Sequence, residues 1–255
     1  MAGARIERVC ARRPDLRYPL PADFVPRLEG QTVRALTRRA KYLLAELSSG
    51  DVLLMHLGMS GSFSVLRGRR REREPATHDH VIFEMSSGAA VVFNDPRRFG
   101  FMRILRGRDD PDAPVLRALG PEPLGRGFTA AVLAQALARK KTSLKAALSD
   151  QRVVSGLGNI YVCEALHRAR LSPKRRASTL VARSGAPRPD ALDLVDAIRA
   201  VLKDAISNSH RPGGADRFRV YDREGERCPR RGCPGLIRRI VQAGRSTFFC
   251  PVCQH

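Results

Sequence analysis

The chain has 255 residues, 43% of them hydrophobic, so it can bury the core of one large or two modest domains. Its 46 lysines and arginines against 25 acidic residues give a formal net charge of +21, which indicates a polyanionic partner. No long apolar run appears, which argues against a membrane partner and favours nucleic acid. With no tryptophan and few aromatic residues, duplex DNA is favoured over a stacked single strand. A merely solvated basic surface is the alternative.

The first part of the chain has the pattern of short β-strands. Apolar runs that alternate with polar residues, separated by Gly or Ser-Gly, predict a sandwich or barrel. The predicted strands are Thr32–Leu36, Tyr42–Leu47, Val52–Leu57, Val81–Phe83, Ala90–Phe93 and Met102–Leu105. The almost wholly charged stretch Arg67–Glu74 is predicted to be a solvated loop.

Helical periodicity begins after Pro123. Thr129 is expected to cap one helix, and Thr142 or Ser143 a second. A last helix is predicted from Asp190 to about Asn208. Helices therefore follow strands along the chain, which indicates an α+β protein of more than one domain.

A glycine-containing turn separates the second and third predicted helices. Gly156 and Gly158 allow unusual backbone conformations, and they precede a helix that starts at Asn159. Such a turn leaves N–H groups free at a helix N-terminus, where a phosphate can bind. The basic run Arg139–Lys141 upstream strengthens this interpretation, and a plain helical hairpin is the alternative.

Four cysteines near the C-terminus have the spacing of a zinc ribbon. They are Cys228, Cys233, Cys250 and Cys253, two close pairs separated by 16 residues that are long enough to form a hairpin. The turn Gln242–Ser246 is expected to carry Arg245 at its tip. Four sulfur ligands close the coordination sphere, so the zinc is expected to be structural. Two disulfides are the alternative, and Cys10 and Cys163 are expected to be uninvolved thiols.

Seven motifs resemble those of bacterial formamidopyrimidine-DNA glycosylases. They occur in the order of that family and span nearly the whole chain: Arg38–Leu44, His56–Ser62, His78–His80, Asp95–Gly100, Gly120–Leu124, Gly156–Tyr161 and Gly244–Phe248. The resemblance implies a β-sandwich at residues 1–115, a helix-two-turn-helix domain at 116–212 and a zinc ribbon at 213–255. It also implies that duplex DNA is held between the lobes.

The same resemblance implies a bacterial cytoplasmic repair enzyme that acts as a monomer on damaged double-stranded DNA with one structural Zn²⁺. Enzymes of the family remove 8-oxoguanine and formamidopyrimidines and then cleave the abasic strand by β,δ-elimination. The damaged base leaves the helical stack during this reaction, and protein side chains fill the hole. The sister glycosylases for oxidised pyrimidines are a less favoured alternative, because the filler residues have the purine-type arrangement.

The family pattern also implies residue roles. Lys41 and Arg245 are the expected catalytic residues, Lys41 acting at the sugar and Arg245 at the phosphates beside the lesion during elimination. The expected DNA contacts are His78, Lys140 and Asn159 on phosphates, and Met59, Arg97 and Phe99 in the hole left by the flipped base. For His78 and His80, a metal pair is a competing interpretation.

Two departures from the family pattern stand out. Family members carry Pro-Glu directly after the initiator Met, whereas this sequence begins Met1-Ala2-Gly3. Two hypotheses follow: a repair enzyme whose start was assigned at an internal Met, or a truncated paralogue that binds damaged DNA without cleaving it. In addition, the segment before Phe218 is shorter than the family's base-capping loop, which predicts an altered preference between 8-oxoguanine and ring-opened purines.

Overall fold

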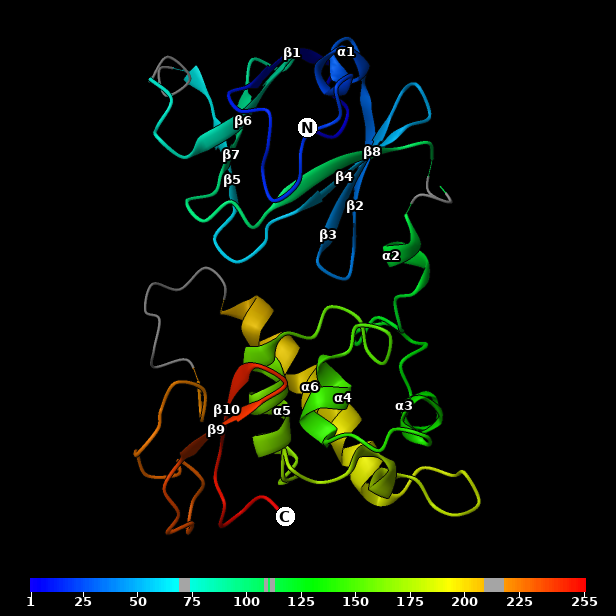
Figure 1. Ribbon diagram of the computed structural model, residues 1–255, viewed down its shortest axis with the longest axis vertical. Helices are drawn as coiled ribbons and strands as arrows, with labels where there is room; N and C mark the ends of the chain where they lie inside the picture. The colour runs from blue at the N-terminus through cyan, green and yellow to red at the C-terminus, as the bar shows by residue number, and fades with distance from the viewer. Residues whose placement is uncertain (69–73, 108–109, 111–112, 209–217) are drawn as a thin grey trace. The chain divides into compact units, whose positions relative to one another are not determined.

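The computed structural model forms two compact units, Met1–Arg117 and Ala118–His255, shown together in Figure 1. The structure describes residues 1–68, 74–107, 110, 113–208 and 218–255. The predicted charged loop at Arg67–Glu74 and the shortened segment before Phe218 lie largely outside these residues. Each unit has its own hydrophobic core and is described by itself.

The first unit is a sandwich of two four-stranded antiparallel sheets, as predicted. One sheet has the order β1 (Ile6–Ala11), β6 (Asp79–Met85), β7 (Ala90–Asn94) and β5 (Ser62–Leu66). The other has the order β2 (Val33–Arg39), β3 (Tyr42–Leu47), β4 (Val52–His56) and β8 (Phe101–Leu105). Two short helices, α1 (Phe24–Leu28) and α2 (Pro114–Arg117), complete the unit. Strands β1 and β5 were not among the predicted runs.

Strand β4 explains how the sandwich is organised. It pairs with β3 on one side and β8 on the other, and its first four residues are all buried. Leu53 and Met55 enter the core between the sheets, whereas Val52 and Leu54 pack with Ala113 on the opposite face. A strand buried on both faces has a continuous apolar sequence rather than an alternating one.

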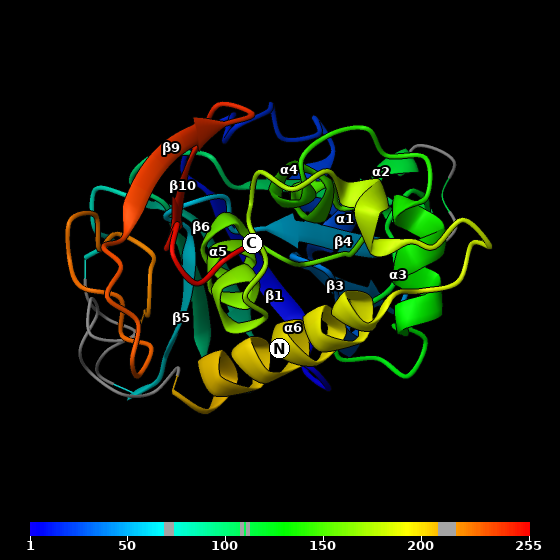
Figure 2. The ribbon, with the colours of Figure 1, turned by 90° about the horizontal axis from the view of Figure 1, so that it is seen from below.

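The second unit is helical and ends in a β-hairpin (Figures 1 and 2). Its helices are α3 (Ala130–Leu137), α4 (Leu144–Ser149), α5 (Asn159–Arg168) and α6 (Pro189–Ser207), with a 3₁₀ turn η2 (Ala177–Leu180). Thr129 and Ser143 cap α3 and α4 through their hydroxyls, as predicted. The apolar face of α6 packs on α5, and the two helices lie against each other in both views.

The hairpin consists of β9 (Arg238–Gln242) and β10 (Arg245–Phe249). The predicted five-residue turn is wrong, because Gln242 pairs with Arg245 and only Ala243 and Gly244 lie between them. These two residues have φ values of 49° and 71°, the backbone of a two-residue hairpin turn that follows the twist of the strands. Arg245 is therefore the first residue of a strand. Among the described helices, none is long and apolar enough to cross a membrane.

Candidate functional site

The four cysteines of the hairpin region form one cluster. Their sulfur atoms all lie within 4.8 Å of one another, with 3.8 Å between Cys228 and Cys253 and 3.6 Å between Cys233 and Cys250. A tetrahedron with Zn–S bonds of about 2.3 Å has edges of about 3.8 Å. These thiols are free cysteines, so the two-disulfide alternative is wrong. Cys10 and Cys163 lie outside the cluster.

The cluster fits one structural Zn²⁺. Backbone N–H groups of Arg230 and Val252 point to the sulfurs of Cys228 and Cys250, the donors that a bound thiolate needs. Burial first, and then hydrogen bonds with the neighbouring thiols, raise the pKa of Cys253 to about 12. A divalent cation would offset the repulsion among the four neighbouring sulfurs, because it binds them in the deprotonated form. Four sulfur ligands leave no open coordination position for substrate, so the ion would stabilise the fold rather than take part in catalysis.

Two loops of the sandwich bring Met59, Arg97 and Phe99 together. At Gly58, which has φ of 66°, a Cβ atom would lie 2.3 Å from the Phe99 carbonyl carbon and 2.5 Å from the Gly100 nitrogen. Only glycine permits this approach of the two backbones. Met59 is 72% exposed and Phe99 39% exposed, and the Arg97 guanidinium lies 4.7 Å from the Phe99 ring centre. The three side chains form one exposed tip rather than part of the core.

A buried carboxylate holds these loops in place. Asp95 is fully buried and accepts hydrogen bonds from the Ser60 hydroxyl and, at 2.7 Å, from the Gly100 N–H. The Ser60 hydroxyl in turn accepts the N–H of Arg97 at 3.2 Å. Sequence analysis singled out the motif that contains Asp95 but gave this residue no role. Its function follows only from the fold, which places Ser60 beside it.

Lys41 lies at the exposed turn between β2 and β3. Arg39 pairs with Tyr42, so the turn consists of Ala40 and Lys41, and the left-handed Ala40 (φ 52°) allows the chain to reverse. Lys41 is therefore a residue of a hairpin turn rather than of a strand. The neighbouring strand places His56 opposite Tyr42.

His56 lies next to the Met59 loop, and sequence analysis gave it no role. Burial first, and then the charges of Lys41 and Arg17, lower the pKa of His56, which favours the neutral imidazole. Its Nδ1 accepts the N–H of Gly58 at 2.9 Å, so the neutral ring carries its proton on Nε2. Its only signal in the sequence is its place at the start of the Met59 motif.

His78 and His80 have different environments. His78 is exposed, whereas His80 is buried with its Nε2 2.9 Å from the Asp95 carbonyl oxygen. Within the described ranges, no group of three potential ligands other than the four cysteines brings its ligand atoms together. The metal-pair alternative is thus not supported, and His78 remains available as a surface donor.

Lys140 follows α3 and forms an ion pair with Asp150, with 2.9 Å between Nζ and Oδ2. Arg152 contacts the same carboxylate at 2.9 Å. Hydrogen bonds from Arg152 first, and then from Lys140, hold the pKa of Asp150 well below its usual range. Two cations on one carboxylate leave a net positive charge next to the glycine turn.

The glycine turn is held by a side chain that sequence analysis did not consider. Gln151 accepts the N–H of Gly156 at 2.9 Å and donates to the carbonyl of Leu157 at 3.0 Å. Gly156 has φ of 77° and needs its glycine, whereas Gly158 has φ of −99° and is the N-cap of α5. The first turn of α5 thereby presents its N–H groups, as an anion site requires.

Asn159 connects helix α5 to the hairpin strand that begins at Arg245. The Asn159 Nδ2 donates to the carbonyl of Ser246 at 2.9 Å, which joins the start of α5 to β10. Lys145, only 1% exposed, points its Nζ to the carbonyl of Gln242 at 3.4 Å. Burial lowers the pKa of Lys145, and the positive charge of Arg245 adds to this effect. The short apolar sequence of α4 gives no sign that this lysine is buried.

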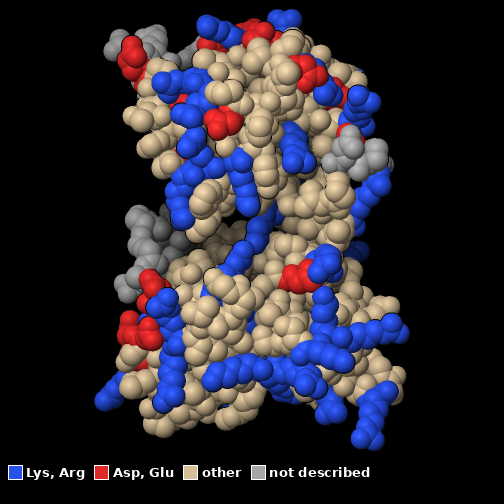
Figure 3. All heavy atoms as spheres, in the orientation of Figure 1, with Lys and Arg blue, Asp and Glu red and all other residues tan. Residues whose placement is uncertain are grey.

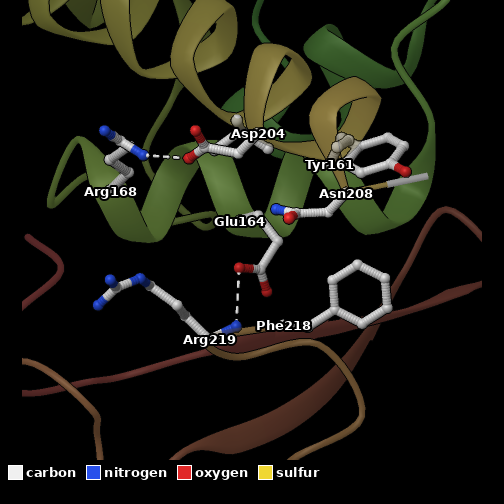
Figure 4. A pocket seen from close by; sticks show the side chains of 9 residues that line it. Tyr161, Glu164, Arg168, Asp204, Asn208, Phe218 and Arg219 are labelled. Atoms are coloured by element: carbon white, nitrogen blue, oxygen red, sulfur yellow. Dashed lines mark hydrogen bonds and ion pairs between the residues drawn. The ribbon is translucent and has the colours of Figure 1, made fainter. Parts of the chain in front are cut away.

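Glu164 anchors the chain that leads into the hairpin. Its carboxylate accepts N–H groups from Arg219, Val220 and Tyr221, each at 2.9 Å. Figure 4 shows Glu164 pointing from α5 to Arg219, beside the Phe218 ring and the ion pair of Arg168 with Asp204. These residues line a cavity of about 100 Å³. Each contact lies within the second unit.

On the face drawn in Figure 3, lysine and arginine cover more of the surface than acidic residues do, on both units. An exposed tip with apolar side chains, a basic surface and a cysteine cluster that fits zinc are features of a protein that binds DNA and opens it at one base. Fold and site therefore define a DNA glycosylase of the base-excision type.

Family profiles match three successive stretches of the chain. Residues 1–102 match the formamidopyrimidine-DNA glycosylase N-terminal domain, residues 119–212 its H2TH domain, and residues 225–255 the zinc finger found in FPG and IleRS. The formamidopyrimidine-DNA glycosylase of Rhodopseudomonas palustris strain HaA2 is 60% identical over 275 aligned positions, covering 100% of this chain and 94% of that protein. That of Afipia carboxidovorans is 59% identical with the same coverage.

Comparison with solved structures indicates the same family. The Lactococcus lactis enzyme bound to DNA with an abasic site matches with a TM-score of 0.86 at 29% identity, covering all of this chain and 94% of that one. The Thermus thermophilus protein matches with a TM-score of 0.82 at 36% identity, covering all of this chain and 92% of its own. The chain belongs to the formamidopyrimidine-DNA glycosylase family, whose members are DNA-repair enzymes with glycosylase and AP lyase activity.

Proposed function

We propose that this protein excises oxidised purines from double-stranded DNA and cleaves the resulting abasic strand, with its fillers on the sandwich loops and its phosphate contacts on both units. The observation that carries the proposal is the contact of Gly58 with Phe99 and Gly100, which places Met59, Arg97 and Phe99 on one exposed tip. Exposed apolar side chains gain burial when they enter a DNA stack that has lost a base.

Each filler has a distinct task. Met59 and Phe99 supply apolar atoms that replace stacking, whereas the Arg97 guanidinium offers donors to the unpaired cytosine. In the free protein, Arg97 stacks on Phe99, so it is held near its working position. Support from a relative comes from the Lactococcus lactis protein in complex with FAPY-dG DNA, which matches with a TM-score of 0.82 at 28% identity.

We assign the phosphate contacts on the sandwich to His78 and His56. On the helical unit we assign them to the backbone N–H groups at the start of α5, whereas the Nδ2 of Asn159 already donates to the Ser246 carbonyl. Lys41 at its hairpin turn and Arg245 at the start of β10 carry the cations for the sugar and the flanking phosphates. Lys140, paired with Asp150, adds positive charge beside the glycine turn. Neutralised phosphates make the affinity fall steeply with salt.

We further propose that the protein acts as a monomer on chromosomal DNA in the bacterial cytoplasm, and that residues 1–115, 116–212 and 213–255 contribute separate DNA contacts. A mass near 28.2 kDa in light scattering supports the monomer. A concentration-dependent dimer contradicts it.

The test compares two adjacent arginines. Arg97→Ala is expected to weaken binding to an abasic-site duplex opposite cytosine by about tenfold or more, the loss of one base contact worth about 1–3 kcal/mol, with less effect on undamaged duplex. Arg98→Ala is the matched control, because it removes the same charge from a side chain that faces Asp15 at 3.8 Å. Equal losses on both duplexes for Arg97→Ala would remove the hole-filling role.

A further inference from the structure

His167 is a buried histidine that the proposed chemistry does not use. It lies near the end of α5 and is only 1% exposed. Its Nε2 is 3.4 Å from the sulfur of Cys228, within hydrogen-bond range for sulfur. Its other ring nitrogen, Nδ1, is buried and has no hydrogen-bond partner among the described residues. The imidazole therefore has a single polar contact, and that contact is a cysteine of the metal cluster.

The position of the proton follows from these two environments. A proton on Nδ1 would be a buried N–H without an acceptor, which is unfavourable because the donor loses its hydrogen bond to water and gains none in return. It would also leave the Nε2 lone pair facing the lone pairs of the Cys228 sulfur. A proton on Nε2 removes both penalties and gives the sulfur a donor. Since metal binding requires Cys228 as thiolate, the contact becomes a charge-assisted N–H···S⁻ hydrogen bond.

His167 is not itself a ligand. The four cysteine sulfurs already form a closed group within 4.8 Å of one another, and the histidine nitrogen is not part of it. We propose that His167 is a positioning residue of the zinc site: its Nε2–H binds the Cys228 thiolate, orients this ligand and joins the metal to helix α5. The inference concerns the metal site and does not depend on which lesion the enzyme removes.

Further contacts make α5 the support of the ribbon. Arg230, two residues after Cys228, donates to the carbonyl of His167 at 2.6 Å. At the other end of the helix, Asn159 donates to Ser246 on β10. Between them, Glu164 holds the backbone that leads into the ribbon. The zinc cluster and the Arg245 hairpin are thus attached to one rigid helix, and His167 is its contact with a metal ligand.

Two substitutions separate a hydrogen bond from packing. His167→Phe keeps a ring of similar size without a donor, and His167→Gln offers a side-chain N–H. Release of zinc to a chromogenic chelator is expected to be about 10–100-fold faster in His167→Phe, the usual effect of removing a partner of a metal ligand. His167→Gln is expected to recover much of this loss. Arg168→Ala is the matched control on the same helix, because Arg168 is exposed and pairs with Asp204.

Spectroscopy gives a readout that packing alone would not change. In protein substituted with Co²⁺, the sulfur-to-metal charge-transfer bands are expected to shift in His167→Phe and return toward wild type in His167→Gln. In protein substituted with ¹¹³Cd and labelled with ¹⁵N-histidine, a scalar coupling between the metal and the His167 Nε2 proton is expected across the hydrogen bond. This measurement uses the unaltered chain, so it holds even if His167→Phe fails to fold.

The proposal is overturned by any of three results. The first is a Co²⁺ spectrum and a zinc release rate that are the same in wild type and His167→Phe. The second is equal behaviour of the Phe and Gln variants, which would assign the effect to packing. The third is a ¹⁵N spectrum that places the proton of His167 on Nδ1.

Discussion

Lys41 and Arg245 each lie on a β-hairpin, and different forces hold the two hairpins. The β2–β3 hairpin with Lys41 continues a sheet whose strands are buried in the sandwich core. The β9–β10 hairpin with Arg245 has two five-residue strands, and it is held by α5 and by the cysteine cluster. A small ribbon cannot bury enough apolar surface to fold alone. The sandwich hairpin is therefore insensitive to metal removal, whereas the ribbon hairpin depends on it.

The largest expected effect follows from loss of the metal. Cys250→Ser is expected to reduce zinc from one ion per chain to none and to unfold the ribbon, because structural zinc supplies on the order of 10 kcal/mol of folding free energy. Elemental analysis measures the loss of zinc. Circular dichroism measures whether the β-structure of the sandwich is retained. The control is Cys10→Ser on β1, outside the cluster. Full zinc retention in Cys250→Ser contradicts the metal assignment.

The second prediction compares the two cations in catalysis. A form of the protein that starts with the family's Met-Pro-Glu segment is expected to give a borohydride-trapped cross-link with abasic DNA and to yield elimination products, because a proline amine is the family's nucleophile. In that form, Lys41→Ala and Arg245→Ala should each lower product yield.

An unchanged product yield in Lys41→Ala or in Arg245→Ala would remove the catalytic role of that residue. Absence of trapping in the form with Met-Pro-Glu would favour a protein that binds damaged DNA without cleaving it. Gel analysis of the cross-link and of the cleaved strand distinguishes these outcomes.

A moderate effect is expected from Asp95, the carboxylate that holds the loops of Met59 and Phe99. Asp95→Ala is expected to lower the free energy of unfolding by about 2–3 kcal/mol, since it leaves the buried Gly100 N–H and Ser60 hydroxyl without an acceptor. Urea unfolding measures this loss, and excision of 8-oxoguanine is expected to fall with it. Asp15→Ala, which removes a partly exposed carboxylate that faces Arg98, is the control. A stability equal to wild type would show that Asp95 does not hold the loops.

The smallest effect concerns pH. The pKa of Asp150 is depressed, so its ion pairs stabilise the protein above the unfolded pKa of about 3.9 and are lost as the pH falls through the lower folded value. Asp150→Asn is expected to cost at most about 1 kcal/mol at pH 7, with the difference from wild type shrinking only below about pH 4. Unfolding curves at about pH 7, 5 and 3 check this, with Asp204→Asn as control. A difference that is constant down to the lowest pH would contradict the ion-pair explanation.

Local patterns predicted much of the fold correctly. The strands around Tyr42 and Val52 and the caps at Thr129 and Ser143 depend on short-range chemistry, so sequence was sufficient for them. The edge strand β5 was missed because its partly exposed, serine-containing sequence lacks a clear apolar alternation. The five-residue turn was wrong because strand pairing, rather than composition, decides where a hairpin reverses.

The candidate site also combines features that the sequence predicts with features that depend on the folded structure. By itself the sequence determined the four cysteines of the cluster and the basic charge, because residue type and spacing are enough to define them. Only the tertiary structure decided that Asp95 holds the loops of Met59 and Phe99, that Lys145 is buried beneath the hairpin and that His167 faces Cys228. Each of these depends on a partner distant in sequence, and burial and hydrogen-bond geometry exist only once the chain has folded.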